Sequence, residues 1–312
     1  MTPRDPSAGS ALPAPSGAPA RAGAGATLGA LARMVKLSHS LFALPFAVAT
    51  VVLVARDARL DALRLALVVV AVVAARTAAM AMNRIADREF DAVNPRTRSR
   101  ELVTGEVSPA AAWALLVGSG AVFTGAAALI STVCGVLALP VLAILLGYSF
   151  AKRFTWACHL WLGVAQALAP IGVAIALTGA APASAIVLGV GVGAWIAGFD
   201  VLYALQDREF DASRRLHSIP ARFGIRGALL WARALHMLAI VLVPLSGVLG
   251  RRGPGWALGS LVLAAVLVAE HVHVAPRGRL CPERINVAFF NYNAFASVGF
   301  ALCALADLAL RP

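Results

Sequence analysis

Long apolar runs, separated by short polar stretches, are the feature that most constrains the fold of this 312-residue chain. A helix needs about 20 mostly apolar residues to cross the hydrocarbon core of a bilayer, and runs of that order recur along the sequence. Only 13% of the residues are charged, whereas a soluble domain has roughly 25%. The runs are too long for the strands of a membrane barrel. The sequence therefore predicts an all-α polytopic membrane protein.

Nine apolar segments are expected to form the transmembrane helices of a bundle. Their predicted ranges are 38–55, 63–82, 109–130, 133–150, 157–178, 184–204, 226–249, 254–273 and 286–309. The N-terminal stretch is rich in Ala, Pro, Gly and Ser and lacks the apolar core of a signal peptide. We expect residues 1–27 to be a disordered tail, followed by one transmembrane domain over residues 28–312.

The basic residues predict how the chain is oriented. A net charge of +12 could indicate a nucleic-acid partner, but the basic residues are confined mainly to short loops between apolar runs. With the N-terminus in the cytoplasm, most of the 27 Lys and Arg residues fall in cytoplasmic segments, as the positive-inside rule requires. We therefore expect a protein of the bacterial plasma membrane whose partner is the lipid bilayer and not nucleic acid.

The same six residues, Asp-Arg-Glu-Phe-Asp-Ala, occur at 87–92 and again at 207–212. Each copy ends an apolar segment, and both copies are predicted on the cytoplasmic side. Residues four apart lie on one face of a helix, so each copy presents a pair of carboxylates together. Such pairs repel each other, more strongly at low dielectric, which predicts a cation between them. The four predicted ligands are Asp87, Asp91, Asp207 and Asp211.

Mg²⁺ suits these carboxylates because it takes hard oxygen ligands and commonly bridges to substrate phosphates. The motifs could therefore hold a metal–diphosphate cluster in which the charge of the leaving group is neutralised. Nearby basic residues would take the remaining phosphate oxygens. The candidates are Arg84, Arg88, Lys152, Arg153 and Arg208.

The alternative for one such motif is a set of interfacial charges that solvate a helix end. For Lys152 and Arg153 the alternative is anchoring of a cytoplasmic loop. Two identical copies on one side of the membrane favour the metal site. Glu89 and Glu209 lie off the Asp face and are expected to pair with Arg or water.

Further polar residues extend both motifs. The first copy reads Asn83-x3-Asp87-x3-Asp91, the second reads Asp200-x2-Tyr203-x3-Asp207-x3-Asp211, and Tyr148-x3-Lys152-Arg153 follows the fourth apolar segment. On these residues the chain resembles the UbiA superfamily of intramembrane aromatic prenyltransferases. The resemblance covers about residues 30–310.

The resemblance implies a helical bundle with a central cavity open to the lipid. Both Asp motifs would lie at its cytoplasmic mouth, under short cap helices. Mg²⁺ on the four Asp residues would bind a polyprenyl diphosphate, with Asn83 and the Tyr148 element assisting. Ionisation would give an allylic carbocation that an aromatic ring attacks. Asp200 would orient the ring or accept its proton, and Tyr203, on the same motif face, is the second catalytic candidate.

The acceptor is open between two aromatic quinone precursors. The chain resembles most the enzymes that prenylate 4-hydroxybenzoate in ubiquinone-type biosynthesis. However, Arg100-Glu101-Leu102 replaces their usual Arg-Pro-Leu, and residues 216–220 depart from a Lys-Ser-Thr-Ala-like stretch. Both departures resemble enzymes of the futalosine route to menaquinone.

Two other functional classes fit less well. A cation-coupled transporter would place its acids near the membrane midplane rather than at helix ends on one side. A phosphatidyl-type alcohol transferase would need a D-G-x2-A-R motif, which the sequence lacks.

Overall fold

Helices form nearly all of the structure, a computed structural model that describes residues 24–36, 44–58 and 60–310. Within these described ranges, eight segments are long and apolar enough to cross a membrane, which confirms the predicted fold class. Their main helices are α3 (Ala62–Val93), α5 (Pro109–Ile130), α6 (Thr132–Gly147), α7 (Cys158–Thr178), α8 (Ala183–Ala204), α10 (Ile219–Leu249), α11 (Pro254–Val274) and α13 (Asn293–Ala309).

The first predicted helix, over 38–55, is represented by α2 (Leu44–Val54), which is apolar but shorter. Residues 37–43 lie outside the described residues. So does most of the predicted N-terminal tail, although α1 (Ala24–Met34) already begins within residues 1–27.

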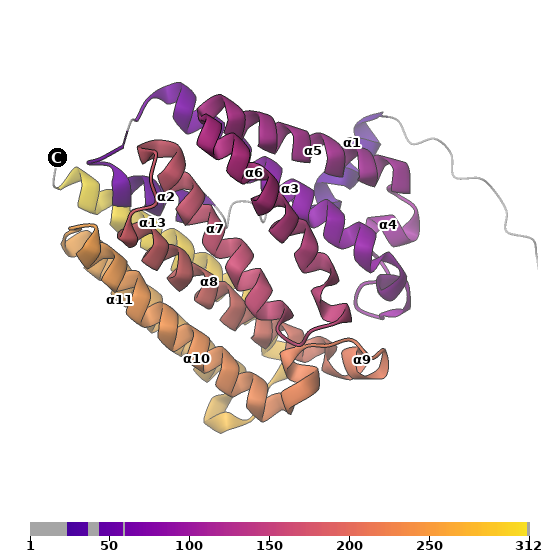
Figure 1. Ribbon diagram of the computed structural model, residues 1–312. Coiled ribbons are helices and arrows are strands. Elements are labelled where there is room, and N and C mark those ends of the chain that lie inside the picture. Colours follow the sequence, from indigo (N-terminus) through magenta and orange to yellow (C-terminus); the bar gives the residue numbers. More distant parts are fainter. Residues whose placement is uncertain (1–23, 37–43, 59, 311–312) are drawn as a thin grey trace, which may run out of the picture.

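Short elements connect the long helices. They are α4 (Glu101–Thr104), η2 (Tyr148–Arg153), η3 (Leu205–Asp207), α9 (Arg208–Ser213), η4 (Pro276–Gly278), η5 (Pro282–Arg284), α12 (Ile285–Val287) and the π-helical turn η6 (Ala288–Tyr292). Figure 1 shows α4 and α9 at one end of the bundle, opposite the C-terminal end of α13. They lie in the two loops where short cap helices were expected.

Helix ends follow local sequence signals. Ser131 has an extended backbone (φ −168°), ends α5 and caps α6 through a bond from Cys134 N to its hydroxyl (3.1 Å). Asp61 caps α3 in the same way, accepting from Arg64 N (2.8 Å). Gly179 ends α7 in the left-handed conformation (φ 79°) that favours glycine.

Two boundaries differ from prediction. The second helix was expected to end at residue 82, but α3 continues to Val93, because charged side chains end an apolar run without ending a helix. The seventh was expected to begin at residue 226, but α10 begins at Ile219 and is broken at Gly224 (φ 66°, ψ −174°). The first acidic motif is therefore helical throughout.

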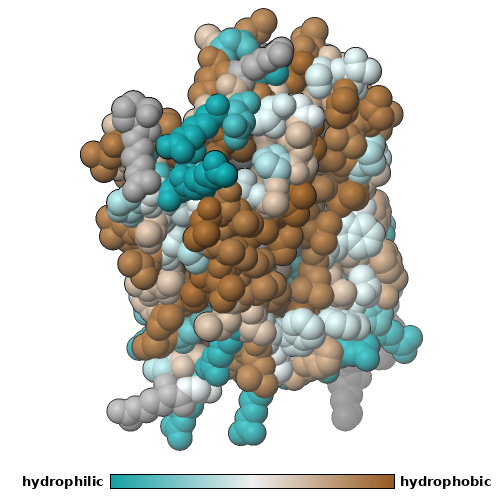
Figure 2. Space-filling model, turned by 60° about the vertical axis from the view of Figure 1, so that its left-hand side comes forward, coloured by the Kyte–Doolittle hydropathy of each residue, from teal (hydrophilic) through white to brown (hydrophobic). Residues whose placement is uncertain are grey.

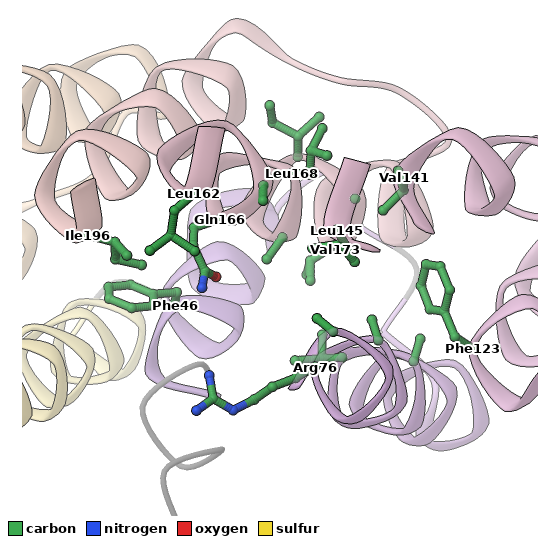
Figure 3. A pocket seen from close by; sticks show the side chains of 18 of the residues that line it. Phe46, Arg76, Phe123, Val141, Leu145, Leu162, Gln166, Leu168, Val173 and Ile196 are labelled. Atoms are coloured by element: carbon green, nitrogen blue, oxygen red, sulfur yellow. The ribbon is translucent and has the colours of Figure 1, made fainter. Parts of the chain in front are cut away.

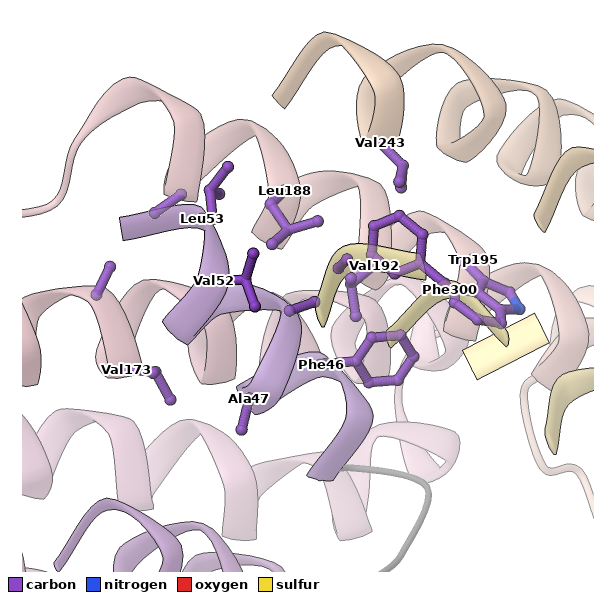
Figure 4. Close-up of a cluster of buried hydrophobic side chains, with 14 of the residues drawn as sticks. Phe46, Ala47, Val52, Leu53, Val173, Leu188, Val192, Trp195, Val243 and Phe300 are labelled. Atoms are coloured by element: carbon purple, nitrogen blue, oxygen red, sulfur yellow. The ribbon is translucent and has the colours of Figure 1, made fainter. Parts of the chain in front are cut away.

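The core lies around α8, which packs closely on α7 and α10. Phe46 on α2 meets Trp195 on α8 edge-to-face (ring centroids 5.0 Å), and Trp256 on α11 meets Phe300 on α13 in the same way (4.9 Å). Figure 4 shows Phe46, Trp195 and Phe300 converging between these helices. Figure 2 shows hydrophobic residues across the middle of one face and hydrophilic residues nearer both ends, as expected for a membrane-spanning surface.

Candidate active site

The first acidic motif occupies the last turns of α3. Asn83 donates from Nδ2 to Asp87 Oδ2 (3.0 Å), so the expected i,i+4 relation holds. Asp91, one turn on, is buried and pairs with Arg100 (Nη1 to Oδ2, 2.5 Å). Because α3 runs through the motif, its three polar side chains share one helix face.

The second motif lies in η3 and α9 and contacts the loop that follows the first. Asp207 accepts from both Nε (2.9 Å) and Nη2 (2.5 Å) of Arg96, and from Asn94 Nδ2 (3.3 Å). Asp211 lies 3.4 Å from Lys152 Nζ. Since Asn94 and Arg96 directly follow the first motif, this loop brings the two motifs to one mouth of the bundle.

The mouth is strongly basic around these carboxylates. Burial alone would disfavour the charged form of Arg96. The hydrogen bonds and negative charge of Asp207 outweigh burial and raise the pKa of the Arg96 guanidinium. Lys36, just after α1, responds oppositely: burial, followed by repulsion from Arg84 and Arg100, lowers its pKa to about 8. The mouth therefore holds fixed positive charge and one lysine that can lose its charge.

The donor set has the chemistry of a Mg²⁺ site. Four carboxylates and the Asn83 amide supply hard oxygens, and the neighbouring cations match a phosphate-bearing partner. Among the described residues, no three acidic, His or Cys side chains gather closely enough to hold one ion. The carboxylates instead form two separate groups, with Asp91, Asp207 and Asp211 each paired to a basic residue.

A cavity of about 540 Å³ lies between the helices beside the mouth. Asn83, Tyr148 and Asp200 contribute polar groups to its lining, whereas most of its walls are apolar. Arg76 on α3 and Gln166 on α7 extend into it from opposite walls (Figure 3). The cavity suits a mostly apolar ligand with a polar end.

The two predicted catalytic residues lie in different surroundings. Asp200 lines the cavity and is hydrogen-bonded to His159 on α7 (Oδ2 to Nδ1, 2.7 Å). The Tyr203 hydroxyl instead accepts from Arg96 Nη1 (3.0 Å), and its ring packs on Phe289 (centroids 4.2 Å). Tyr203 is therefore placed to support Arg96.

The predicted phosphate-binding residues divide into two sets. Asn83, Tyr148 and Lys152 lie at the mouth or on the cavity wall. Arg84 donates to the carbonyl of Met34 (3.2 Å), and Arg208 pairs with Glu209 (3.1 Å), as expected for an off-face glutamate.

Arg88 and Arg153 line a different groove, together with Glu89, Trp113 and Phe150. Arg153 also donates to the carbonyl of Ala86 (2.5 Å). In the described part of the chain, neither arginine forms an ion pair with any of the four aspartates.

Seven residues described at the site were not predicted as site residues: Lys36, Arg76, Asn94, Arg96, Arg100, His159 and Gln166. Arg96 and Arg100 lie in a basic loop whose charges contributed to the predicted orientation. The available signal for Arg76 and His159 was their position inside apolar segments, where an ionisable residue is commonly functional.

Comparison with known proteins gives a consistent match. The model of the UbiA prenyltransferase family matches residues 43–294. A 4-hydroxybenzoate octaprenyltransferase of Pseudomonas aeruginosa (strain UCBPP-PA14) is 31% identical over 258 residues, covering 83% of this chain and 86% of the relative. The enzyme of the same name from Azotobacter vinelandii is 31% identical over 241 residues, covering 77% of this chain and 79% of the relative.

Solved structures agree on the fold. A UbiA homolog from Aeropyrum pernix K1, without ligand, superposes with a TM-score of 0.78 at 33% identity, covering 86% of this chain and 98% of the other. A UbiA homolog from Archaeoglobus fulgidus bound to DMAPP and Mg²⁺ gives a TM-score of 0.69 at 19% identity, covering 90% of this chain and 99% of the homolog.

Proposed function

The chain belongs to the UbiA prenyltransferase family, and we propose that it transfers a polyprenyl group from a polyprenyl diphosphate to an aromatic quinone precursor, most readily 4-hydroxybenzoate. One observation carries this proposal: the loop after the first acidic motif reaches the second through Arg96 and Asp207, so four carboxylates and their basic partners surround one mouth beside an apolar cavity. A diphosphate at the mouth leaves the isoprenoid tail against apolar walls.

The metal is proposed to be Mg²⁺, held by Asp87, Asp91, Asp207 and Asp211. The hard-oxygen donor set supports this, as does the Archaeoglobus fulgidus homolog solved with DMAPP and Mg²⁺. When bound, the ion neutralises charge on the diphosphate leaving group. Arg96, Arg100 and Lys152, which pair with the aspartates in this structure, would bind phosphate oxygens of the diphosphate, Arg96 through both Nε and Nη2.

The acceptor is proposed to lie deeper, between Asp200 and Arg76. Both residues line the cavity, and a cation there complements the carboxylate of an aromatic acid. Asp200 faces the ring and receives its proton. Names of the curated relatives support 4-hydroxybenzoate as this acid. The basic loops support an orientation with this mouth in the cytoplasm of a bacterial plasma membrane.

A futalosine-route precursor is the second candidate acceptor. It is favoured by the segment after α9, where His217 N donates to the carbonyl of Lys152 (2.7 Å). This hydrogen bond connects residues 216–220, which depart from the pattern of 4-hydroxybenzoate enzymes, with Lys152 at the mouth.

An assay on membranes containing the protein tests the proposal. Radiolabelled polyprenyl diphosphate is supplied with 4-hydroxybenzoate, a futalosine-type acid or no acceptor, each with Mg²⁺ or with EDTA. We expect Mg²⁺-dependent prenylation of 4-hydroxybenzoate. Prenylation of the other acid alone would reassign the acceptor. No transfer to either acid would overturn the proposal and return attention to cation-coupled transport.

A further inference from the structure

A histidine lies directly behind the aspartate that faces the acceptor. His159, in the first turn of α7, has only 1% of its surface exposed, and its Nδ1 lies 2.7 Å from Asp200 Oδ2. Asp200 lines the cavity, whereas His159 does not. The proposed mechanism uses Asp200 and gives no task to the residue that holds it.

The hydrogen bond defines which nitrogen of His159 carries the proton. An ionised carboxylate only accepts, so Nδ1 must be the donor to Asp200. His159 Nε2 is buried and has no hydrogen-bond partner among the described residues. In the cation both ring nitrogens carry a proton, and in the neutral ring this hydrogen bond selects the tautomer protonated on Nδ1, so Nδ1 donates to Asp200 in either state. Asp200 therefore receives a directed donor from the protein interior.

Close helix packing fixes the position of this pair. One turn further along α7, Gly163 faces Gly193 of α8, and a Cβ atom on Gly193 would lie 2.4 Å from the Gly163 carbonyl oxygen. Small residues allow helix backbones to approach this closely within membranes. The side chains of His159 and Asp200 can consequently meet without bending either helix. Other titratable groups that interact electrostatically with this pair are Cys158, Tyr148 and Lys152.

We propose that His159 is a positioning residue that holds the Asp200 carboxylate in place and keeps it aimed at the acceptor ring. In the step it supports, the bond between the prenyl carbon and the diphosphate oxygen breaks, and a bond forms from that carbon to the ring. The proton on the attacked ring carbon then moves to Asp200, and its C–H electron pair restores aromaticity. This assignment rests on the proposed function.

Two substitutions separate hydrogen bonding from packing. His159→Asn can still present an N–H near the position of Nδ1, whereas His159→Leu fills similar space without a donor. Wild-type enzyme and both variants are assayed with 4-hydroxybenzoate and with the same acid deuterated at both ring carbons ortho to the hydroxyl. Binding of an unreactive thiolodiphosphate donor analogue, and thermal unfolding, establish that each variant is folded.

We expect His159→Leu to lower kcat about tenfold or more, less than the roughly 10²–10⁴-fold effect of losing a general base outright. The KM for acceptor should change little, and a primary isotope effect should emerge because proton loss becomes slow. His159→Asn should restore most of the rate and remove the isotope effect.

Equal rates for wild type and His159→Leu, or equal losses in both variants without an isotope effect, would overturn the inference while leaving the proposed function intact. Failure of the wild-type enzyme to prenylate 4-hydroxybenzoate would instead remove the proposed function, and this inference with it.

Discussion

Four carboxylates near one another repel each other. At this mouth, ion pairs with basic residues offset that repulsion when no metal ion is bound. Asp207 is held by both donors of Arg96, Asp91 by Arg100 and Asp211 by Lys152. Asp87 has only the Asn83 amide as its hydrogen-bond partner among the described contacts. The basic residues thus complete the charge balance of the site.

Asp207→Asn should reduce prenyl transfer by about 100-fold or more, the scale expected when a group that stabilises transition-state charge is lost. The variant also weakens the pairing with Arg96, so thermal unfolding is measured alongside turnover. Glu209→Gln, in the same six-residue motif, is the matched control. Its side chain is 89% exposed and pairs with Arg208, so activity should stay near wild type. Full activity in Asp207→Asn would contradict the metal assignment.

Lys36 predicts a pH dependence of donor binding. Its lowered pKa of about 8 means that the ammonium is charged below that pH and neutral above it. The KM for polyprenyl diphosphate should therefore rise as pH increases through about 8, while the KM for acceptor stays flat. Lys36→Arg, which keeps its charge to pH above about 12, should abolish the rise. Identical profiles for the two proteins would exclude Lys36 as the cause.

Helical geometry explains which site residues could be predicted from the sequence. The spacing of four correctly places Asn83 and Asp87 in hydrogen-bond contact. Neighbours in sequence, however, lie about 100° apart around a helix, and so Arg84 and Arg88, each next to a motif residue, point elsewhere. The contribution of Arg96 depends on how a loop folds across to another helix, which no local spacing encodes.

At the scale of elements, hydropathy identified the spanning segments better than their ends. The apolar run that begins α3 was predicted to stop at residue 82, just before Asn83 and Arg84, yet the helix continues through the acidic motif. Conversely, α8 ends at Ala204, so the second copy of the six-residue string begins in the 3₁₀ turn η3 at Asp207, whereas the first copy is α-helical throughout. Their surroundings, rather than local propensity, account for this difference.

The α7–α8 contact gives a prediction at this scale. Gly193→Ala places a Cβ atom 2.4 Å from the Gly163 carbonyl oxygen, so the helices must move apart. We expect a loss of roughly 1–3 kcal/mol in stability, and reduced turnover as His159 and Asp200 separate. Gly118→Ala on α5 is the control, because a Cβ there meets nothing within 4 Å. Thermal unfolding in detergent measures both, and equal midpoints would contradict the close packing.

For the whole molecule, a buried polar network joins the helices that form one wall of the cavity. Trp195 on α8 donates to Asn293 Oδ1 (2.7 Å), and Asn293 donates to Glu270 Oε1 on α11 (3.1 Å). His236 on α10 approaches the Trp195 carbonyl through Nε2 (3.2 Å). Trp195 and Asn293 both line the cavity, so the network links the shape of the substrate space to the packing of α8, α10, α11 and α13.

This network should tolerate replacement of its carboxyl group by an amide far better than the loss of its central amide, Asn293. Asn293→Leu leaves the Trp195 N–H and Glu270 Oε1 without these bonds in a buried site, which costs roughly 1–3 kcal/mol for each group. Glu270→Gln retains an acceptor oxygen for Asn293 and should be nearly neutral. Thermal unfolding of the two purified variants tests this order. Because Asn293 also lines the cavity, Asn293→Leu should additionally weaken binding of the donor tail. If Glu270→Gln proved as destabilising as Asn293→Leu, the carboxyl group of Glu270, and not the hydrogen-bonded amide, would be what holds this wall together.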